Sequence, residues 1–459
     1  MASSVVECAR GADTQVSMRR RVRRWVYHRL MRGLTGACIV ALAMAKFIGR
    51  RPRARRDGRG ATVLLTGRFE SDSWIRSHVQ PMAESQACAQ VWVVATTPVP
   101  KIPKVEGIVP ARWLMRLIGA TPARLLVFAW VGLWRRPDAV GGFHLLVNGL
   151  AAILLARLVG ARSLHFCVGG ACEVLDGGVR GDANPFTRME TPDPVVERRL
   201  LRAVNACDLM ITMGSRAIEY YRQRGVNTEF RVISGGIDAE AFSPSDGPQP
   251  TDLILVGRLA PIKRIDVFLQ AVRLVAQQRP GLSAVIVGDG VLREPLERLT
   301  RELGIEGQVR LVGRQDNVGE WFRQAKLFVL SSDSEGLSLA LMEAMMSGLP
   351  AIVSNVGDLP DLVDDGVNGY LVERRRPEEL ARRILELLAD DRKRQAFSGA
   401  ARQAALRYSI PSASRRWDAV LGQLQSPPSA VVGQAGGRVG TRKRRSAGRR
   451  RVKARPMSR

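Results

Sequence analysis

The chain has 459 residues, a formal net charge of +27 at pH 7 and 46% hydrophobic residues. This length allows two or three domains with substantial cores, and the composition is typical of a globular protein rather than a disordered one. Residues 1–60 hold 15 Lys/Arg and three acids, and residues 431–459 hold 11 Lys/Arg and no acid, which leaves 44 basic and 40 acidic residues for 61–430. The nearly balanced body argues against a nucleic-acid groove in the fold, and the basic tails favour contact with an anionic surface.

The first 60 residues form a basic N-terminal extension. A basic stretch at 19–32 precedes an apolar run at 34–45, which is shorter than the roughly 20 residues that a membrane-spanning helix needs. Three interpretations stay open: a membrane-surface amphipathic anchor, a cleaved signal peptide, and a poorly ordered or mis-started segment. At the other end, residues 431–459 are rich in Gly and Arg, so we expect a disordered basic tail.

The six cysteines include no C-x-x-C pair, and none of them has a zinc-like spacing with the four histidines. We therefore expect no metal site. Reduced thiols are the usual state in the cytosol, so we expect a cytoplasmic protein, with its basic tails able to hold it at the cytosolic face of a membrane.

Short apolar runs alternate with helix-forming segments from residue 61 onward. In the first half, the predicted strands are 63–65, 91–94, 163–166 and 209–212. The predicted helices between them include 147–159 and 194–206. A stretch rich in Pro, Ser and Gly at 243–250 is interpreted as a linker. The second half has predicted strands at 252–256, 284–287, 309–312, 327–330, 351–353 and 370–372.

This alternation predicts an α/β fold with parallel, doubly wound sheets and right-handed crossovers. Two such sheets joined by one linker indicate two Rossmann-like domains that face a cleft, at 61–242 and 251–408. Ligands bind such sheets at the carboxyl ends of the strands, so the functional residues are expected there.

Two long apolar stretches stand out in the first domain, at 113–134 and 145–159. The arginines within or beside the first stretch are Arg112, Arg116, Arg124, Arg135 and Arg136. Trp, Phe and Arg together are typical of a helix at a membrane interface. Core helices with basic ends have the same composition, and both interpretations stay open.

Two glutamates frame the segment SEGLSLALMEA at 334–344. Glu335 falls on the turn after an apolar strand, and Glu343 ends a helix-prone run; a helix N-terminus at such a turn can bind phosphate. On one helix the two carboxylates would be about 12 Å apart along the axis, whereas the carboxyl groups of a retaining glycosidase lie about 5–5.5 Å apart. We interpret them as two separate ligand contacts; a solvated turn residue and an exposed helical residue are the alternative.

Glycine and cations stand at the end of another predicted strand. Gly257 allows a tight turn after the strand at 252–256, and Arg258 and Lys263 follow it. An Arg can bind two phosphate oxygens and a Lys adds a point charge, so together they can neutralise a diphosphate without a metal. In the first domain, His165 lies at the end of a predicted strand, where it is either a cleft residue or a satisfied core residue.

The order of these motifs resembles the retaining glycosyltransferases of family 4. The motifs are His165 on a strand, Val-Ile-x-x-Gly-Ile-Asp at 232–238, Gly-Arg-Leu at 257–259 with Lys263, and Glu335-Gly336 to Glu343-Ala344. Segments 346–354 and 365–372 match the same family. The resemblance is strong over 200–410, weaker over 61–200 and absent from both tails.

This resemblance implies a GT-B fold, in which an N-terminal acceptor domain and a C-terminal nucleotide-sugar domain face each other. In this fold a C-terminal helix crosses back to the first domain, and it is expected at 409–430. The site residues that it implies are Glu335 and His165 as catalytic residues, and Gly257, Arg258, Lys263, Leu337, Ser338, Leu339 and Glu343 as donor-binding residues. By the same resemblance, the cations hold the donor phosphates, Glu335 contacts sugar hydroxyls near the reacting carbon, Glu343 contacts the ribose, and His165 faces the sugar.

The implied reaction keeps the donor's anomeric configuration, needs no metal or further cofactor, and uses a UDP-, GDP- or ADP-sugar. A glycan or a lipid-linked molecule would be the acceptor, and the oligomeric state stays open. Departures from the family pattern are Gly235 where Asn is common, Asp358 where a second Gly is usual, and Asp361 where Glu is usual. A nucleotide-sugar 2-epimerase of the same fold and a non-enzymatic membrane-associated scaffold are the alternatives.

Overall fold

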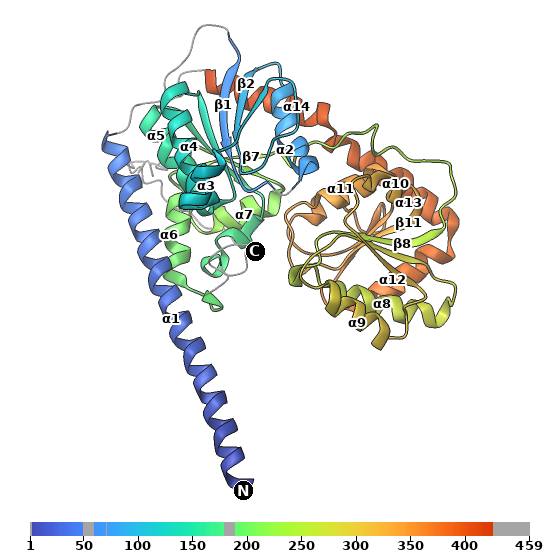
Figure 1. Ribbon diagram of the computed structural model, residues 1–459. Helices are drawn as coiled ribbons and strands as arrows, with labels where there is room; N and C mark the ends of the chain where they lie inside the picture. Colours follow the sequence, from blue (N-terminus) through green and yellow to red (C-terminus); the bar gives the residue numbers. More distant parts are fainter. Residues whose placement is uncertain (1, 49–58, 70, 179–188, 426–459) are drawn as a thin grey trace, which may run out of the picture.

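The computed structural model describes residues 2–48, 59–69, 71–178 and 189–425 of the chain. They form two lobes, each built on a parallel sheet with helices on both faces (Figure 1). The first sheet has seven strands in the order β3-β2-β1-β4-β5-β6-β7, and the second has six in the order β10-β9-β8-β11-β12-β13. The prediction of two doubly wound sheets is therefore confirmed.

The strands are short apolar runs because helices cover both faces of each sheet. In the first sheet they are β1 (Ala61–Thr66), β2 (Cys88–Val94), β3 (Val105–Ile108), β4 (Ala139–Phe143), β5 (Arg162–Cys167), β6 (Leu209–Thr212) and β7 (Glu229–Val232). In the second they are β8 (Thr251–Val256), β9 (Ala284–Val287), β10 (Val309–Gly313), β11 (Ala325–Leu330), β12 (Ala351–Ser354) and β13 (Gly369–Val372). Phe328 and Leu330 of β11, for example, are completely buried in the second lobe.

Helices connect the strands in both lobes. Those of the first lobe are α2 (Asp72–Glu84), α3 (Arg112–Ile118), α4 (Ala120–Arg135), α5 (Leu150–Val159), α6 (Pro194–Val204) and α7 (Ser215–Gln223). Those that follow are α8 (Ile265–Gln278), α9 (Arg293–Glu302), α10 (Val318–Arg323), α11 (Leu339–Met346), α12 (Pro377–Ala389), α13 (Asp391–Ala405) and α14 (Ile410–Gln425). The helix expected at 147–159 begins as an α-helix only at Leu150, after a π-helical turn at Leu145–Gly149.

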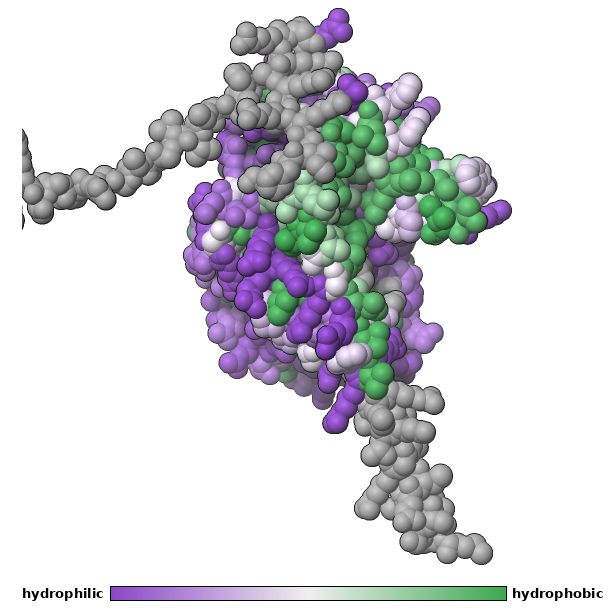
Figure 2. Space-filling view, turned by 90° about the vertical axis from the view of Figure 1, so that its left-hand side faces the viewer, coloured by the Kyte–Doolittle hydropathy of each residue, from purple (hydrophilic) through white to green (hydrophobic). Residues whose placement is uncertain are grey.

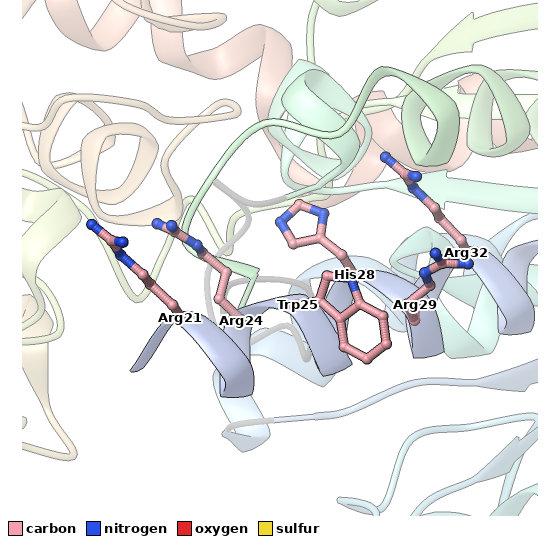
Figure 3. Close-up of a pocket in the computed structure, with 6 residues that line it drawn as sticks. All are labelled: Arg21, Arg24, Trp25, His28, Arg29 and Arg32. Atoms are coloured by element: carbon pink, nitrogen blue, oxygen red, sulfur yellow. The ribbon is translucent and has the colours of Figure 1, made fainter. Parts of the chain in front are cut away.

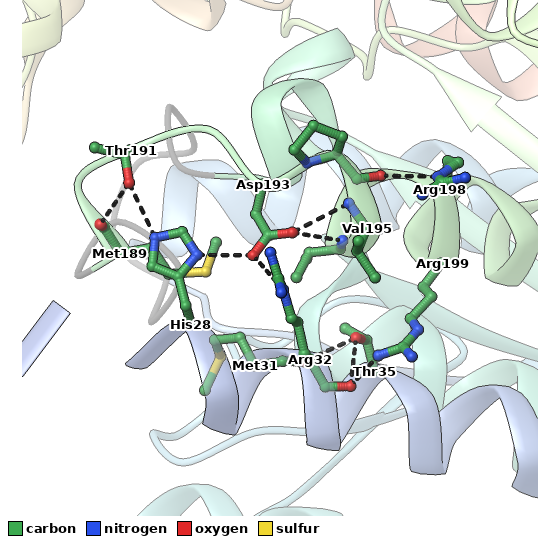
Figure 4. Close-up of polar contacts among 12 residues, drawn as sticks. His28, Met31, Arg32, Thr35, Met189, Thr191, Asp193, Val195, Arg198 and Arg199 are labelled. Atoms are coloured by element: carbon green, nitrogen blue, oxygen red, sulfur yellow. Dashed lines mark hydrogen bonds and ion pairs between the residues drawn. The ribbon is translucent and has the colours of Figure 1, made fainter. Parts of the chain in front are cut away.

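The basic N-terminal segment forms one long helix, α1 (Ala2–Ile48), which runs along α5 and α6 of the first lobe (Figure 1). Figure 4 shows how its polar side chains hold it there: His28 Nδ1 and Arg32 Nε lie 2.7 and 2.9 Å from Asp193 Oδ2. Leu42 is buried against the apolar residues under this helix. The C-terminal half of this helix thus packs against the helical layer of the first lobe, whereas its N-terminal half projects beyond the lobe (Figure 1).

The last described helix returns to the first lobe, where α14 packs on α2. Trp417 and Leu421 of α14 are buried in the core of the first lobe, and Asp418 Oδ1 accepts a hydrogen bond of 2.6 Å from Ser85 Oγ. The chain thus crosses between the lobes twice, once before β8 and once before α14. The basic tail predicted at 431–459 lies outside the described residues.

Candidate active site

A cavity of about 500 Å³ lies between the two lobes and is lined by residues of both. The predicted residues that line it are Gly257, Arg258, Lys263, Glu335, Leu337, Ser338, Leu339 and Glu343. They come from the carboxyl ends of β8 and β11 and from α11, as expected for ligand-binding residues of a parallel sheet. The structure thus brings together every predicted site residue of the second lobe.

A close ion pair joins two of these residues. Lys263 Nζ lies 2.6 Å from Glu335 Oε1, and the two side chains are only 16% and 10% exposed. Ser332 Oγ donates a second hydrogen bond to the same carboxylate oxygen. Because little water reaches this pair, the attraction is stronger than that of a surface ion pair. The loop between β11 and α11 is held against the turn after β8 by this contact.

Glycines let the loop that carries Glu335 pass between the two lobes. A Cβ atom on Gly336 would lie 2.4 Å from the carbonyl oxygen of Val168 in the first lobe. On the other side, a Cβ on Gly357 would lie 1.7 Å from the carbonyl oxygen of Glu335, and Gly357 has a φ of +53°. Both distances are far below van der Waals contact. The conformation of this loop therefore requires glycine at both positions.

Glu343 lies on α11, one turn into the helix, and faces the cavity from a half-buried position. Desolvation by its surroundings raises the pKa of the Glu343 carboxyl to about 8. At neutral pH this side chain is therefore mostly protonated and can both donate and accept hydrogen bonds. Ser338 caps the same helix, and its Oγ accepts a hydrogen bond from Leu341 N.

The two acidic departures from the family pattern lie where the second lobe meets α7 of the first. Asp361 accepts hydrogen bonds from the backbone N–H and the hydroxyl of Ser215, and Asp358 Oδ1 accepts one of 3.2 Å from Ala217 N. Both carboxylates thus cap the N-terminus of α7 from the opposite lobe. Burial raises the pKa of Asp358 to about 6.

His165 does not line the cavity. It lies within β5, where its side chain is completely buried, and its Nε2 lies 3.4 Å from Glu173 Oε2. Two other histidines of the first lobe line the cavity: His78 of α2, which is almost completely buried, and His144, which directly follows β4 and is 41% exposed at its side chain. The sequence prediction chose the histidine inside a strand, whereas the more exposed cavity histidine lies just beyond the neighbouring strand, and a position after a strand end is a signal for a cleft residue.

Glu173 connects His144 with His165. Its carboxylate accepts hydrogen bonds from Leu145 N at 2.8 Å and Gly169 N at 2.9 Å, and it contacts His144 Nδ1 at 3.2 Å. Burial alone would raise the pKa of Glu173, but these hydrogen bonds and the two imidazoles hold it well below its usual value. Glu173 therefore stays ionised and orients His144 at the cavity wall.

One group of buried side chains has the residue types of a metal site. The ligand atoms of His165, Cys167 and Glu173 lie within 4.8 Å of one another. Burial raises the pKa of the Cys167 thiol well above its usual value, and Cys167 Sγ donates to Gly170 O at 3.2 Å. The Glu173 carboxylate already accepts two backbone hydrogen bonds and contacts both histidines, and a metal would require a thiolate at Cys167. Both ring nitrogens of His165 are buried without a hydrogen bond among the described residues. The protonated thiol and the occupied carboxylate disfavour a metal ion in this group.

The two-lobe arrangement with the cavity between the sheets is the GT-B fold. A sucrose-phosphate synthase from Thermosynechococcus elongatus aligns with a TM-score of 0.66 at 19% identity, over 79% of this chain and 99% of that one. Anabaena HepE, solved in complex with UDP and glucose, aligns with a TM-score of 0.63 at 16% identity, again over 79% and 99%. The predicted fold class is confirmed.

Sequence similarity identifies the family within this fold. Residues 238–404 match the family described as Glycosyl transferases group 1. The D-inositol 3-phosphate glycosyltransferase of Streptomyces scabiei is 32% identical over 320 residues, which cover 62% of this chain and 68% of that protein. The chain spans about half the length of other curated relatives that it matches. The chain belongs to the glycosyl transferases group 1 family, and the resemblance found in its motifs is confirmed.

Proposed function

We propose that this chain is a retaining glycosyltransferase that moves a sugar from a nucleotide-diphosphate donor to a glycan or lipid-linked acceptor. The observation that carries the proposal is the meeting of Lys263 and Glu335 in the cavity between the lobes, with Arg258 and Glu343 lining the same cavity. A diphosphate needs cations, and the hydroxyls of a sugar and a ribose need hydrogen-bond acceptors. This cavity offers both.

In this proposal Arg258 and Lys263 bind the donor phosphates, and the backbone at Leu337 to Leu339 adds N–H groups at the start of α11. Glu343 binds the ribose, and Glu335 binds hydroxyls of the transferred sugar. The two cations neutralise the leaving diphosphate, so the reaction needs no metal ion. A UDP-sugar is the first donor to test, because HepE was solved with UDP and glucose.

The hydrogen bonds of Glu335 and the protonation of Glu343 support retention of configuration without a covalent intermediate. Glu335 already accepts hydrogen bonds from Lys263 and Ser332, and Glu343 is mostly protonated at neutral pH. Neither is a free nucleophile. We therefore propose attack from the face that the diphosphate leaves: the bond from the anomeric carbon to the phosphate oxygen breaks, the acceptor oxygen bonds on the same face, and its proton passes to the leaving phosphate. His144 takes the position facing the sugar that was predicted for His165.

Two properties of the chain agree with an acceptor at a membrane surface, namely its basic ends and the exposed apolar helices of the first lobe. Among the described residues, no helix combines the length and the hydropathy that crossing a membrane requires. On the strength of the basic ends and the exposed apolar helices, a peripheral position at the cytosolic face of a membrane is part of the proposal.

Screening UDP-, GDP- and ADP-sugars for thermal stabilisation tests donor binding, since a ligand at about 100 times its dissociation constant stabilises the folded state by about 2.7 kcal/mol. NMR of the product made from the stabilising donor then reads the anomeric configuration, with and without EDTA. An inverted product would contradict retention, and loss of activity in EDTA would contradict metal independence. Release of a 2-epimer without any acceptor would favour the epimerase alternative, and stabilisation by none of the donors would contradict the proposal as a whole.

A further inference from the structure

Two helices on one side of the first lobe, α3 and α4, expose large apolar side chains. On α3, Trp113 and Leu117 are 67% and 74% exposed; on α4, Trp130, Leu133 and Trp134 are 63%, 56% and 77% exposed. Trp130 and Trp134 stack with their ring centroids 6.4 Å apart. These five residues are called the tryptophan face below. Figure 2 looks onto the side of the molecule along which α1 runs and shows apolar side chains gathered into one large patch in its upper part.

The exposed residues of α4 form a second apolar stripe on a helix that already has a buried one. Phe128 and Val131 point inward and are completely or almost completely buried in the first lobe. Trp130 and Trp134, one helical turn apart, lie on the outer side. A helix of a water-soluble lobe normally carries polar residues there. The outer stripe of α4 is thus suited to a second apolar environment besides the protein core.

The surroundings of the tryptophan face are basic and contain hardly any acid. The helices α3, α4 and α5 include no Asp or Glu, and neither does the sequence from 14 to 56. Arg112 and Arg116 are exposed on α3 beside Trp113 and Leu117. The acid at the edge of this surface, Glu106, forms an ion pair with Arg135 at 2.9 Å.

The helix α1 carries a second basic surface on the same lobe, where it packs beside α5. Arg21, Arg24 and Arg29, together with Trp25, His28 and Arg32, line a hollow of about 350 Å³ on α1. Figure 3 shows the guanidinium groups of Arg21 and Arg24 projecting in the same direction from this helix. Trp25, on the same stretch, is 60% exposed. Aromatic and cationic side chains thus occur together on α1 as they do on α3.

We propose that the tryptophan face and the basic residues of α1 and α3 dock the first lobe onto the surface of an anionic lipid bilayer. Trp and Leu side chains gain by burial at the boundary between headgroups and acyl chains, while Arg side chains attract anionic headgroups. A second copy of the chain is a poor occupant, because two such faces would bring like charges together. A nucleic acid would pair with the arginines but offers no apolar phase for Trp130, Leu133 and Trp134.

The docked helix lies next to the cavity wall. Arg124, on the inner side of α4, is buried and donates hydrogen bonds to the carbonyl of Gly67 and, at 2.6 Å, to Asn148 Oδ1. Asn148 and Arg68, the neighbour of Gly67, both line the cavity. A bilayer on the outer side of α4 would therefore lie one helix away from the acceptor side of the cavity. Access to a lipid-linked acceptor is the consequence that rests on the proposed function; the docking does not.

Vesicle sedimentation of the full chain tests the docking, with vesicles of phosphatidylcholine that contain about one third phosphatidylglycerol. The test variant combines Leu117→Ser, Trp130→Ser and Trp134→Ser, all at exposed positions that the fold does not need. We expect its vesicle partition coefficient to fall about tenfold or more, because the variant loses apolar burial at three sites. We also expect vesicles to shift the tryptophan emission of the wild type to the blue and to leave that of the variant almost unchanged.

A matched control replaces exposed valines of the second lobe, Val291→Ser and Val367→Ser, which are 83% and 50% exposed. This control should bind vesicles like the wild type. The donor should stabilise all three proteins equally, and this measurement tests the cavity independently of lipid binding. Equal vesicle binding by the test variant and the wild type would overturn the proposal, since the basic ends alone would then hold the chain on lipid. So would a wild-type dimer that the three substitutions dissociate while vesicle binding stays unchanged.

Discussion

Lys263 Nζ and Glu335 Oε1 lie 2.6 Å apart although 72 positions separate the two residues in the sequence. The pair joins the turn after β8 to the loop before α11, which are the two places where predicted donor-binding residues leave the second sheet. A donor diphosphate in the cavity would share Lys263 with this carboxylate. The cation and the carboxylate are therefore expected to act as one unit, and replacing either should affect both.

Replacing Lys263 tests this unit. We expect Lys263→Ala to reduce sugar transfer by about a hundredfold or more, because it removes a cation from the phosphates and leaves a largely buried carboxylate with one hydroxyl partner. The matched control is Lys326→Ala, which breaks the 2.7 Å ion pair of Lys326 with Asp252 outside the cavity. Steady-state kinetics of both variants make the comparison. Similar losses in the two would show that the ion pair matters only for stability.

The raised pKa of Glu343 predicts a pH effect on stability. Its pKa is about 8 in the folded protein against 4.5 ordinarily, so the folded state holds a proton that the unfolded state has lost. The contribution of Glu343 to stability therefore falls as the pH rises from about 4.5 to about 8. Glu343→Gln does not titrate, so its melting temperature should rise relative to the wild type across this window and then level off. A difference that is constant from pH 5 to 9 would contradict the raised pKa of the half-buried Glu343.

The affinity for the donor should also depend on the protonation of Glu343. If the ribose hydroxyls donate to an ionised Glu343, the affinity of the wild type for the nucleotide should increase with pH up to about 8. The affinity of Glu343→Gln should be lower and should increase less with pH; some increase remains because the terminal phosphate of UDP loses its own proton at about pH 6. Calorimetric titrations of both proteins with UDP at several pH values measure the difference. The same pH dependence in both proteins would indicate that the ribose does not contact this carboxyl.

His144 and His165 should respond in opposite ways to substitution. His144 lines the cavity and is partly exposed, so His144→Ala should lower kcat about tenfold or more and change the melting temperature little. His165 is completely buried, so His165→Ala should lower stability by roughly 1–3 kcal/mol through the cavity that it leaves. Paired measurements of kcat and of denaturant unfolding separate the two effects. A large loss of kcat in a stably folded His165→Ala protein would indicate that His165, as first predicted, contributes to catalysis.

A methyl group at Gly336 should disturb the loop of Glu335. Its Cβ would lie 2.4 Å from the carbonyl oxygen of Val168, so the loop or the first lobe has to move. We expect Gly336→Ala to lose most of its activity while each lobe stays folded. Gly399→Ala on α13 is the control, because no atom lies within 4 Å of a Cβ there and alanine favours the helix. Normal turnover by Gly336→Ala would mean that the lobes are not this close during the reaction.

The sequence alone predicted the two sheets, because strands buried on both faces must be apolar and the helices between them must be long enough to cross back. It also predicted the second-lobe site. Gly257, Lys263 and Glu335 follow strands of one parallel sheet, and the carboxyl ends of such strands meet at one edge regardless of their distance in the sequence. Both predictions rest on local pattern and on a geometric rule of parallel sheets.

Two other features of the site depended on which elements pack together. His144 rather than His165 reaches the cavity because the direction of a side chain at a strand end follows from the twist and packing of the sheet. Asp358 and Asp361 acquire partners only because the N-terminus of α7, in the other lobe, lies against them. Both are tertiary contacts that no local pattern specifies.

The apolar helices of the first lobe show this most clearly. The stretch at 113–134 has one composition, which fits a core helix and a membrane-facing helix equally well. Only the structure assigns Phe128 to the core and Trp130 to the surface, since burial is decided by the neighbours that pack on a helix. The sequence by itself thus determined the fold class and the second-lobe residues that meet in the cavity, whereas the orientation of His144 and His165 and the exposed apolar face of the first lobe followed from tertiary packing.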